Sequence, residues 1–128
     1  MKEEIIYQET LQFCEVTIFP DYLYVVMNEG ITVVPEYNDI LINLTNTYYQ
    51  EKDFVYITHR IHSYSVNPTI YLETARIENL KGFAVVALDS EKEVINTKVE
   101  KLFFNKPFAL FDSLEDAIHW KNTLLYSD

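Results

Sequence analysis

Two segments of the chain are apolar at every position, and they constrain the fold more than any other feature of the sequence. They are FVYI, residues 54–57, and FAVVAL, residues 83–88. Successive side chains of a strand point to opposite faces of its sheet, so a segment that is apolar at both parities is typical of a strand covered on both sides, as in a parallel sheet. A further four-residue segment, FALF at residues 108–111, predicts another strand.

The first part of the chain predicts an antiparallel strand pair. Residues 12–19, QFCEVTIF, alternate between apolar and polar side chains with one exception, which is typical of a strand with one wet face. A Pro-Asp turn follows, and residues 23–27, LYVVM, form the partner strand. Strands joined by so short a turn must be antiparallel. Residues 1–10 are expected to be a flexible or edge segment of a single domain that spans residues 1–128.

Four helices are predicted between and after these strands. The first begins at Pro35, because proline is favoured in the first helical position, where its missing N–H costs nothing. The second begins at Asn67, a favoured N-cap, with Pro68 as its first helical residue, and is expected to run to about Asn79.

The third and fourth helices are predicted from their capping residues. Ser90 and Glu93 form a capping box, and Ser113 with Asp116 three residues later caps the last helix. The residues expected to face the core are Tyr37, Ile40, Leu41, Leu44 and Tyr48 on the first helix, Ile95, Val99, Leu102 and Phe103 on the third, and Leu114, Ala117, Trp120 and Leu124 on the fourth. The order β-β-α-β-α-β-α-β-α predicts an α/β fold with right-handed crossovers. It is a small mixed, mostly parallel sheet with an antiparallel N-terminal strand pair, flanked by about four helices.

The charge and composition of the chain argue against several partners. With 20 acidic and 10 basic residues the net charge is −10, and Lys and Arg form no cluster, so neither nucleic acid nor an anionic membrane is an expected partner. The longest apolar run is far too short to span a membrane, and the acidic N-terminus does not resemble a signal peptide. The single cysteine, Cys14, excludes an internal disulfide, and a cytoplasmic location is expected.

The polar segment THRIHSYSVNPTIY, residues 58–71, is the expected functional region, because loops at the carboxyl ends of parallel strands are where open α/β sheets place ligands. The candidate residues for binding a partner or ligand are Arg60, His62, Ser63, Tyr64, Ser65 and Asn67. Arg60 is expected to pair with a partner's charge and Tyr64 to serve as an aromatic anchor, while the other four offer hydrogen bonds. The alternative is that the polar groups satisfy the local backbone while Tyr64 and Tyr71 pack over the sheet.

Catalytic and metal-binding roles have little support in the sequence. His59 and His62 would point to opposite faces of a strand, and His119 is distant, so no metal site is expected. Cys14 lies among apolar residues, which is typical of a buried cysteine rather than of a nucleophile. Two glycines are too few for a phosphate-binding loop. No catalytic residue and no cofactor are expected.

Three segments, HRIHSYSVNPTIY, FAVVAL and FALFDSLEDAIHW, resemble the STAS-like family (sulfate transporter and anti-sigma factor antagonist) related to the sporulation anti-anti-sigma factor. The resemblance covers the chain from about Leu11. It implies a small mixed sheet flanked by helices, no catalytic activity and no cofactor. In anti-anti-sigma factors a kinase phosphorylates a serine in the loop where this chain has Ser63 and Ser65. The Asp-Ser pair usual there, followed by Ser or Thr and Gly, is replaced by SVNP.

Together these observations predict a non-enzymatic, regulatory domain that recognises a partner protein through the loop before the second helix. The alternative is a carrier or sensor of a small apolar ligand in an aromatic-lined pocket. The first helix is rich in tyrosine, with Tyr37 near its start and Tyr48 and Tyr49 at its end. Such a surface can dock a second copy of the chain as a homodimer, or its rings can close the edge of the core.

Overall fold

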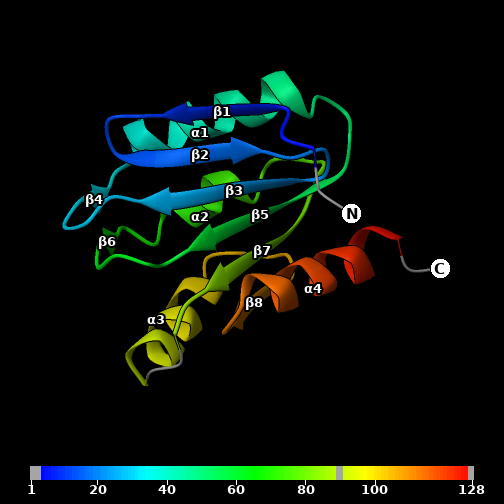
Figure 1. Ribbon diagram of the computed structural model, residues 1–128. Helices are drawn as coiled ribbons and strands as arrows, with labels where there is room; N and C mark the ends of the chain where they lie inside the picture. Colours follow the sequence, from blue (N-terminus) through cyan, green and yellow to red (C-terminus); the bar gives the residue numbers. More distant parts are fainter. Residues whose placement is uncertain (1–3, 89–90, 127–128) are drawn as a thin grey trace.

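The computed structural model describes residues 4–88 and 91–126 and contains a six-stranded mixed sheet with helices on both faces (Figure 1). Its elements are β1 (Tyr7–Thr10), β2 (Cys14–Ile18), β3 (Tyr22–Met27), β4 (Thr32–Val33), α1 (Pro35–Tyr48), β5 (Phe54–His59), β6 (Ser65–Val66), α2 (Ile70–Thr74), β7 (Leu80–Val86), α3 (Glu91–Lys101), β8 (Phe108–Phe111) and α4 (Leu114–Tyr126). The predicted α/β class and its antiparallel start are confirmed.

The strands of the large sheet lie in the order β1-β2-β3-β5-β7-β8. The pairs β1–β2 and β2–β3 are antiparallel, and β3, β5, β7 and β8 run parallel to one another. One row of paired residues crosses the whole sheet through Glu9, Val16, Val25, Thr58, Val85 and Leu110. Part of the expected N-terminal segment is therefore the edge strand β1.

The two faces of the sheet carry different helices. The larger core cluster lies between one face and α1, α2 and the chain after α3, with Leu41, Ile70 and Phe104 among its buried members. The smaller cluster lies between the other face and α4 (Figure 1). Gly82 of β7 allows α4 to approach closely, since a Cβ there would lie 2.6 Å from Leu124 Cδ1.

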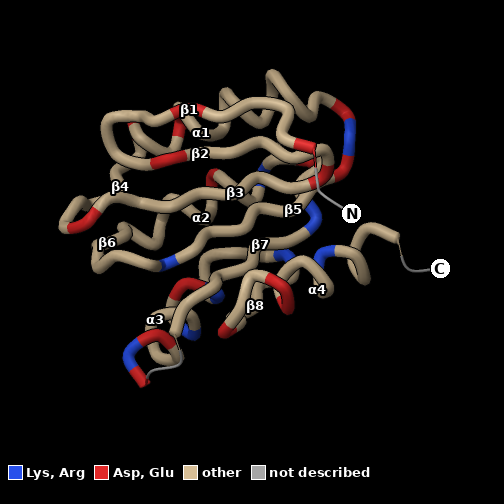
Figure 2. Tube along the Cα trace, viewed as in Figure 1, with Lys and Arg blue, Asp and Glu red and all other residues tan. Residues whose placement is uncertain are grey.

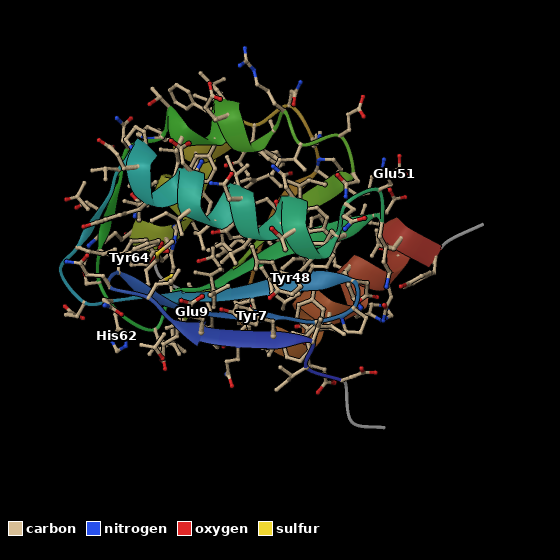
Figure 3. All side chains as sticks on the ribbon, turned by 90° about the horizontal axis from the view of Figure 1, so that it is seen from above. Tyr7, Glu9, Tyr48, Glu51, His62 and Tyr64 are labelled. Atoms are coloured by element: carbon tan, nitrogen blue, oxygen red, sulfur yellow. The ribbon has the colours of Figure 1, made fainter. Side chains whose placement is uncertain are left out.

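Aromatic stacking closes the edge of the larger core. Tyr7 of β1 stacks on Tyr48 of α1 with ring centroids 4.9 Å apart (Figure 3). Tyr37 stacks on Phe13, and Tyr49 stacks on Phe54, at 4.3 and 4.2 Å. The tyrosines at the two ends of the first helix thus pack against the protein's own core. This agrees with the expectation that their rings close the edge of the core.

The last helix and most of the first follow the sequence pattern. The backbone N–H of Asp116 donates to Ser113 Oγ at 3.1 Å, which confirms the predicted cap of α4. The four residues expected to face inward on α4 all pack against the smaller cluster. On α1, which begins at Pro35, Leu41 is buried, but Ile40 is exposed and does not belong to the core stripe.

The second helix is shorter than predicted. Instead of running from Asn67 to about Asn79, α2 has only five residues. The Asn67 side-chain oxygen accepts hydrogen bonds from the backbone N–H and hydroxyl of Thr69, so it closes a tight turn ahead of the helix. At the other end Thr74 bonds the buried Asn38 of α1, and successive turns lead into β7.

Of the four residues predicted to face the core from the third helix, Phe103 packs against the larger core, but the other three face outward. Ile95, Val99 and Leu102 are 61%, 46% and 82% exposed, whereas Thr97 and Glu100 are buried. The apolar spacing gave the wrong face because Glu100 is drawn inward by a buried arginine, described below. Ser90 lies outside the described residues, and Leu88, the last residue of the FAVVAL segment, is 85% exposed because β7 ends at Val86.

No helix in the described ranges is long and apolar enough to cross a membrane. Along this part of the chain Lys and Arg are scattered among the acidic residues rather than gathered on one element (Figure 2).

Candidate functional site

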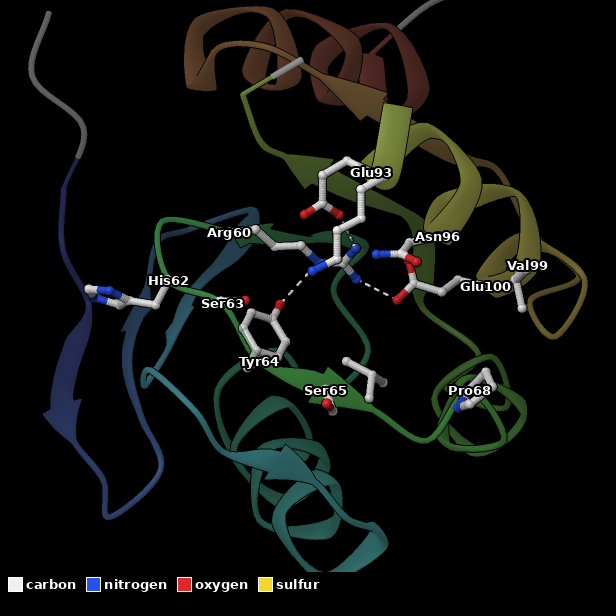
Figure 4. A pocket seen from close by; sticks show the side chains of 12 residues that line it. Arg60, His62, Ser63, Tyr64, Ser65, Pro68, Glu93, Asn96, Val99 and Glu100 are labelled. Atoms are coloured by element: carbon white, nitrogen blue, oxygen red, sulfur yellow. Dashed lines mark hydrogen bonds and ion pairs between the residues drawn. The ribbon is translucent and has the colours of Figure 1, made fainter. Parts of the chain in front are cut away.

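A pocket of about 380 Å³ lies beyond the carboxyl end of β5, between the segment that leads to α2 and one face of α3 (Figure 4). The first wall comprises Arg60, His62, Ser63, Tyr64, Ser65, Val66 and Pro68, and the second comprises Lys92, Glu93, Asn96, Val99 and Glu100. Its volume is within the usual range for ligand sites, and its position at the carboxyl ends of parallel strands is where α/β sheets place ligands. The region expected from the sequence therefore forms one wall of this pocket.

The rim of the pocket is braced by a second, two-stranded sheet. Within it β4 and β6 pair in parallel, so that Thr32 lies opposite Ser65. The backbone N–H of Gly30 donates to Ser63 O at 2.7 Å, and that of Ser65 donates to Ile31 O at 2.9 Å. Gly30 has a φ of 77°, a conformation that glycine adopts without strain. The exposed serines are thus carried on backbone whose position is fixed.

Arg60 forms the floor of the pocket with two carboxylates of α3. Its Nη2 lies 2.5 Å from Glu100 Oε2, and its Nη1 lies 3.1 Å from Glu93 Oε1 (Figure 4). Its Nε donates to the Tyr64 hydroxyl at 3.1 Å. Although burial disfavours its charge, Tyr64, Tyr71 and Glu100 raise the pKa of Arg60 above its ordinary value. The guanidinium, 7% exposed, stays charged and joins the strand to the helix.

Tyr71 completes the buried network from α2. Its hydroxyl donates to Glu100 Oε2 at 2.8 Å and accepts from Arg60 Nη2 at 3.3 Å. Burial, followed by the negative charge of Glu100, raises the pKa of Tyr71 well above its ordinary value, so the phenol remains a donor at neutral pH. Three elements, β5, α2 and α3, therefore meet at one carboxylate oxygen.

The other oxygen of that carboxylate is unpaired. Glu100 is 6% exposed, and its Oε1 is the buried side-chain polar atom that lacks a hydrogen-bond partner in the described part of the chain. A buried polar atom left without a partner costs about 1–3 kcal/mol, and more when it is charged. Such an atom needs an explanation, which a ligand can supply.

Five of the six predicted residues line this pocket, Asn67 does not, and the six have different surroundings. His62, Ser63, Ser65 and Asn67 are exposed, and Tyr64 is half-buried with its ring against the core. Tyr64 and Tyr71 thus pack inward as the ordinary alternative stated, and Asn67 makes its local turn. The expectation that Arg60 displays its charge to a partner needs correction, because both of its charged contacts are with carboxylates of this chain.

The two predicted phosphoacceptors are exposed but do not lie at the start of α2. Ser65 lies in β6, and α2 begins only at Ile70, so a phosphate on Ser63 or Ser65 would not sit at the first turn of that helix. The α3 residues of the pocket were not anticipated. The sequence does hint at an acidic residue there, because an arginine buried at the end of a strand needs an acidic partner. Spacing alone does not say which glutamate is that partner.

His59 and His62 contact neighbouring side chains of this chain, and Cys14 is buried. His59 Nδ1 lies 2.7 Å from the Tyr24 hydroxyl, whereas His62 faces Glu29 at 3.8 Å. In the residues that the structure describes, no three potential ligands gather into a metal site. Burial, with smaller contributions from Glu15 and Glu9, raises the pKa of the Cys14 thiol to about 12, so it stays protonated at neutral pH.

The apolar cavity next to the pocket is small. A cavity of about 20 Å³ lies beneath the pocket among Met27, Tyr56, Ile70 and Phe83. This volume suits about one water molecule and is far below the few hundred Å³ that a small organic ligand needs.

Comparison with known proteins shows the fold. No family model and no curated protein matches the sequence. Among solved structures, the chain is similar to an uncharacterised DUF3478-family protein with a SpoIIAA-like fold from Shewanella loihica PV-4, with a TM-score of 0.56 and 17% identity over 92% of each chain. This chain has a SpoIIAA-like fold. SpoIIAA is the anti-anti-sigma factor, so the STAS-like resemblance of the sequence is confirmed at the level of the SpoIIAA-like fold.

Proposed function

We propose that this chain is a cytoplasmic, non-enzymatic regulatory domain of STAS type. It recognises a partner protein through the exposed residues at the edge of the pocket between the segment before α2 and α3. The recognition surface comprises His62, Ser63, Ser65 and Asn67, with the pocket beside them. The observation that carries the proposal is the pairing of β4 with β6, which holds these exposed polar groups on a fixed backbone. A preorganised surface loses less conformational entropy when it binds.

The outer face of α3 supports this proposal. Val99 lines the pocket, and two further exposed apolar side chains are Ile95 of α3 and Leu102, which follows the last residue of that helix. Exposed apolar side chains that adjoin a polar rim are typical of surfaces that bind another protein. A partner that covers both would bury the apolar stripe that the fold leaves in contact with water.

The test is quantitative capture of partners from the native host with three forms of the tagged protein. Ser65→Glu places a charge on the rim, and Thr47→Glu places one on the exposed surface of α1 as a matched control. We expect cross-linked proteins to be enriched equally by the wild type and Thr47→Glu and reduced at least tenfold by Ser65→Glu. Equal enrichment by all three forms would show that the rim is not the binding surface. Native mass spectrometry of the same samples would reveal a small apolar ligand, the alternative, if one is carried.

A further inference from the structure

The two-stranded sheet beside the pocket has one edge without a partner strand. The backbone N–H groups of Ser65 and Asn67 donate to carbonyl oxygens of the segment that contains β4. In a parallel pair, the residues that alternate with these point their N–H and C=O groups away from the neighbouring strand. Here those residues are Tyr64 and Val66, and their backbone groups make no hydrogen bond within the described part of the chain.

This free edge borders the pocket. Tyr64 and Val66 line one side of it, and Val99 of α3 lines the other. Figure 4 shows β4 and α3 on opposite sides of β6, so the backbone groups that turn away from β4 lie on the side of α3. The outer edges of β1 and β8 also lack a partner strand in the described residues, but neither strand lines this pocket.

An extended peptide has the chemistry that this edge requires. A strand beside β6 would lie about 4.8 Å from it and could exchange hydrogen bonds with both N–H and both C=O groups of Tyr64 and Val66. An extended segment of three residues is about 10 Å long. Since Val66, Pro68 and Val99 line the pocket, they can contact apolar side chains of such a segment.

The edge is held in position before anything binds. On one side β4 fixes the backbone, and in the floor of the pocket Arg60 Nε donates to the Tyr64 hydroxyl at 3.1 Å. A strand that pairs with a fixed edge orders only itself, which lowers the entropic cost of binding.

We propose that the pocket binds an extended segment of the partner protein, which adds as a strand to the free edge of residues 64–66 opposite α3. The inference rests on the proposed function and specifies how the partner is held. Main-chain hydrogen bonds provide the affinity, and apolar side chains in contact with Val66, Pro68 and Val99 provide the selectivity.

The first experiment titrates the full-length ¹⁵N-labelled chain with the capped peptide Ac-Thr-Val-Thr-Val-Thr-NH₂, whose β-branched residues favour an extended backbone. At saturation we expect the amide signals of Tyr64 and Val66 to move downfield and their exchange with solvent to slow at least tenfold. The control peptide carries N-methyl groups on its central residues and should bind at least tenfold more weakly, because it has lost the donors. Equal binding of the two peptides, or no shift at residues 64–66, would overturn the proposal.

A first pair of variants tests the main-chain contact. Val66→Pro removes an N–H that points away from β4, a position where an edge strand tolerates proline. Val66→Ala trims the same side chain and keeps the N–H. Peptide binding should fall at least tenfold in Val66→Pro and much less in Val66→Ala. Equal affinities of the two folded variants would show that this N–H makes no contact with the peptide.

A second pair tests the opposite wall and leaves β6 intact, so it decides the matter if Val66→Pro is poorly folded. Val99→Phe narrows the space between α3 and the edge and should weaken peptide binding at least tenfold. Val94→Phe enlarges an exposed valine of the same helix outside the lining and should bind as the wild type does. Unchanged binding by Val99→Phe would refute the placement.

Partner capture then separates the inference from the proposed function. If Val99→Phe loses the protein partner as Ser65→Glu does, and the peptide binds at residues 64–66, the added strand belongs to that partner. If the peptide binds there but capture depends on neither residue, the proposed function fails and so does the assignment of the strand to a partner. If capture depends on Ser65 while the peptide fails to bind, the inference fails and the proposed function stands.

Discussion

The guanidinium of Arg60 lies 2.5 Å from Glu100 Oε2, and this contact joins the end of β5 to α3 across 40 positions of sequence. It explains the orientation of α3 better than the apolar spacing of the helix does. A buried ion pair places strict demands on both partners, since each is costly to bury alone.

Removing Arg60 should destabilise the fold strongly. Arg60→Met leaves Glu100 as an uncompensated buried charge, and we expect the free energy of unfolding to fall by about 3–5 kcal/mol. The double variant Arg60→Met/Glu100→Gln removes both charges of the pair and should recover more than half of the loss. Urea unfolding of the two variants and the wild type measures this. If the double variant were no more stable than Arg60→Met, the pair would not act as a coupled unit.

The exposed position just after α3 should tolerate charge. Leu102→Lys places an ammonium where the structure has a side chain in water, so the free energy of unfolding should change by less than about 0.5 kcal/mol. Leu41→Ala, on the buried face of α1, should cost about 2–5 kcal/mol. Thermal and urea unfolding compare the two. A large loss of unfolding free energy in Leu102→Lys would instead support the prediction from the sequence that Leu102 faces the core.

Gly82 should not accept a side chain. A Cβ at this position would lie 2.6 Å from Leu124 Cδ1 and 3.0 Å from the Trp120 ring. Gly82→Ala therefore requires the Leu124 and Trp120 side chains to shift, and we expect a loss of about 1–3 kcal/mol. Leu124→Ala in the same chain makes room for the new methyl group, so its own cost should be smaller in the Gly82→Ala background than in the wild type. Additive losses, measured by urea unfolding, would contradict a steric origin.

The stability of the protein should fall in mild acid partly because of His59. Burial lowers the pKa of His59 below its ordinary value of 6.5. The unfolded chain then binds a proton more readily than the folded one, so the contribution is complete above pH 6.5 and is lost as the pH falls through the lower folded pKa. NMR titration should place the His59 midpoint below its ordinary value of 6.5. Free energies of unfolding measured from pH 7.5 to 5 should decline less steeply in His59→Gln, and an unchanged slope would rule out this residue as a source.

The sequence predicts those parts of the fold that local chemistry determines. The doubly covered strand β5 follows from apolar residues at both parities, and the start of α4 follows from Ser113. The two-residue strands β4 and β6 leave no periodic signal, because their pairing depends on segments more than thirty positions apart. The orientation of α3 depends on one ion pair between distant residues, which outweighs the spacing of three aliphatic side chains.

In the candidate site, too, one part could be predicted from the sequence and another could not. The loop of residues 60–67 was identifiable, because its polar side chains follow a parallel strand. Its second wall was not, because Glu100 gains its role only when Arg60 and Tyr71 reach it from other elements. A local pattern can thus locate one side of a pocket, while the other side is determined by the assembled tertiary structure.

The pairing of Thr32–Val33 with Ser65–Val66 has a consequence beyond rigidity. Val33 is followed at once by Val34 and the start of α1, so the pocket rim and the first helix share a single length of backbone. Occupancy of the pocket that displaces Ser65 would therefore pull on the N-terminal turn of α1, on the far side of the larger core from β7 and β8.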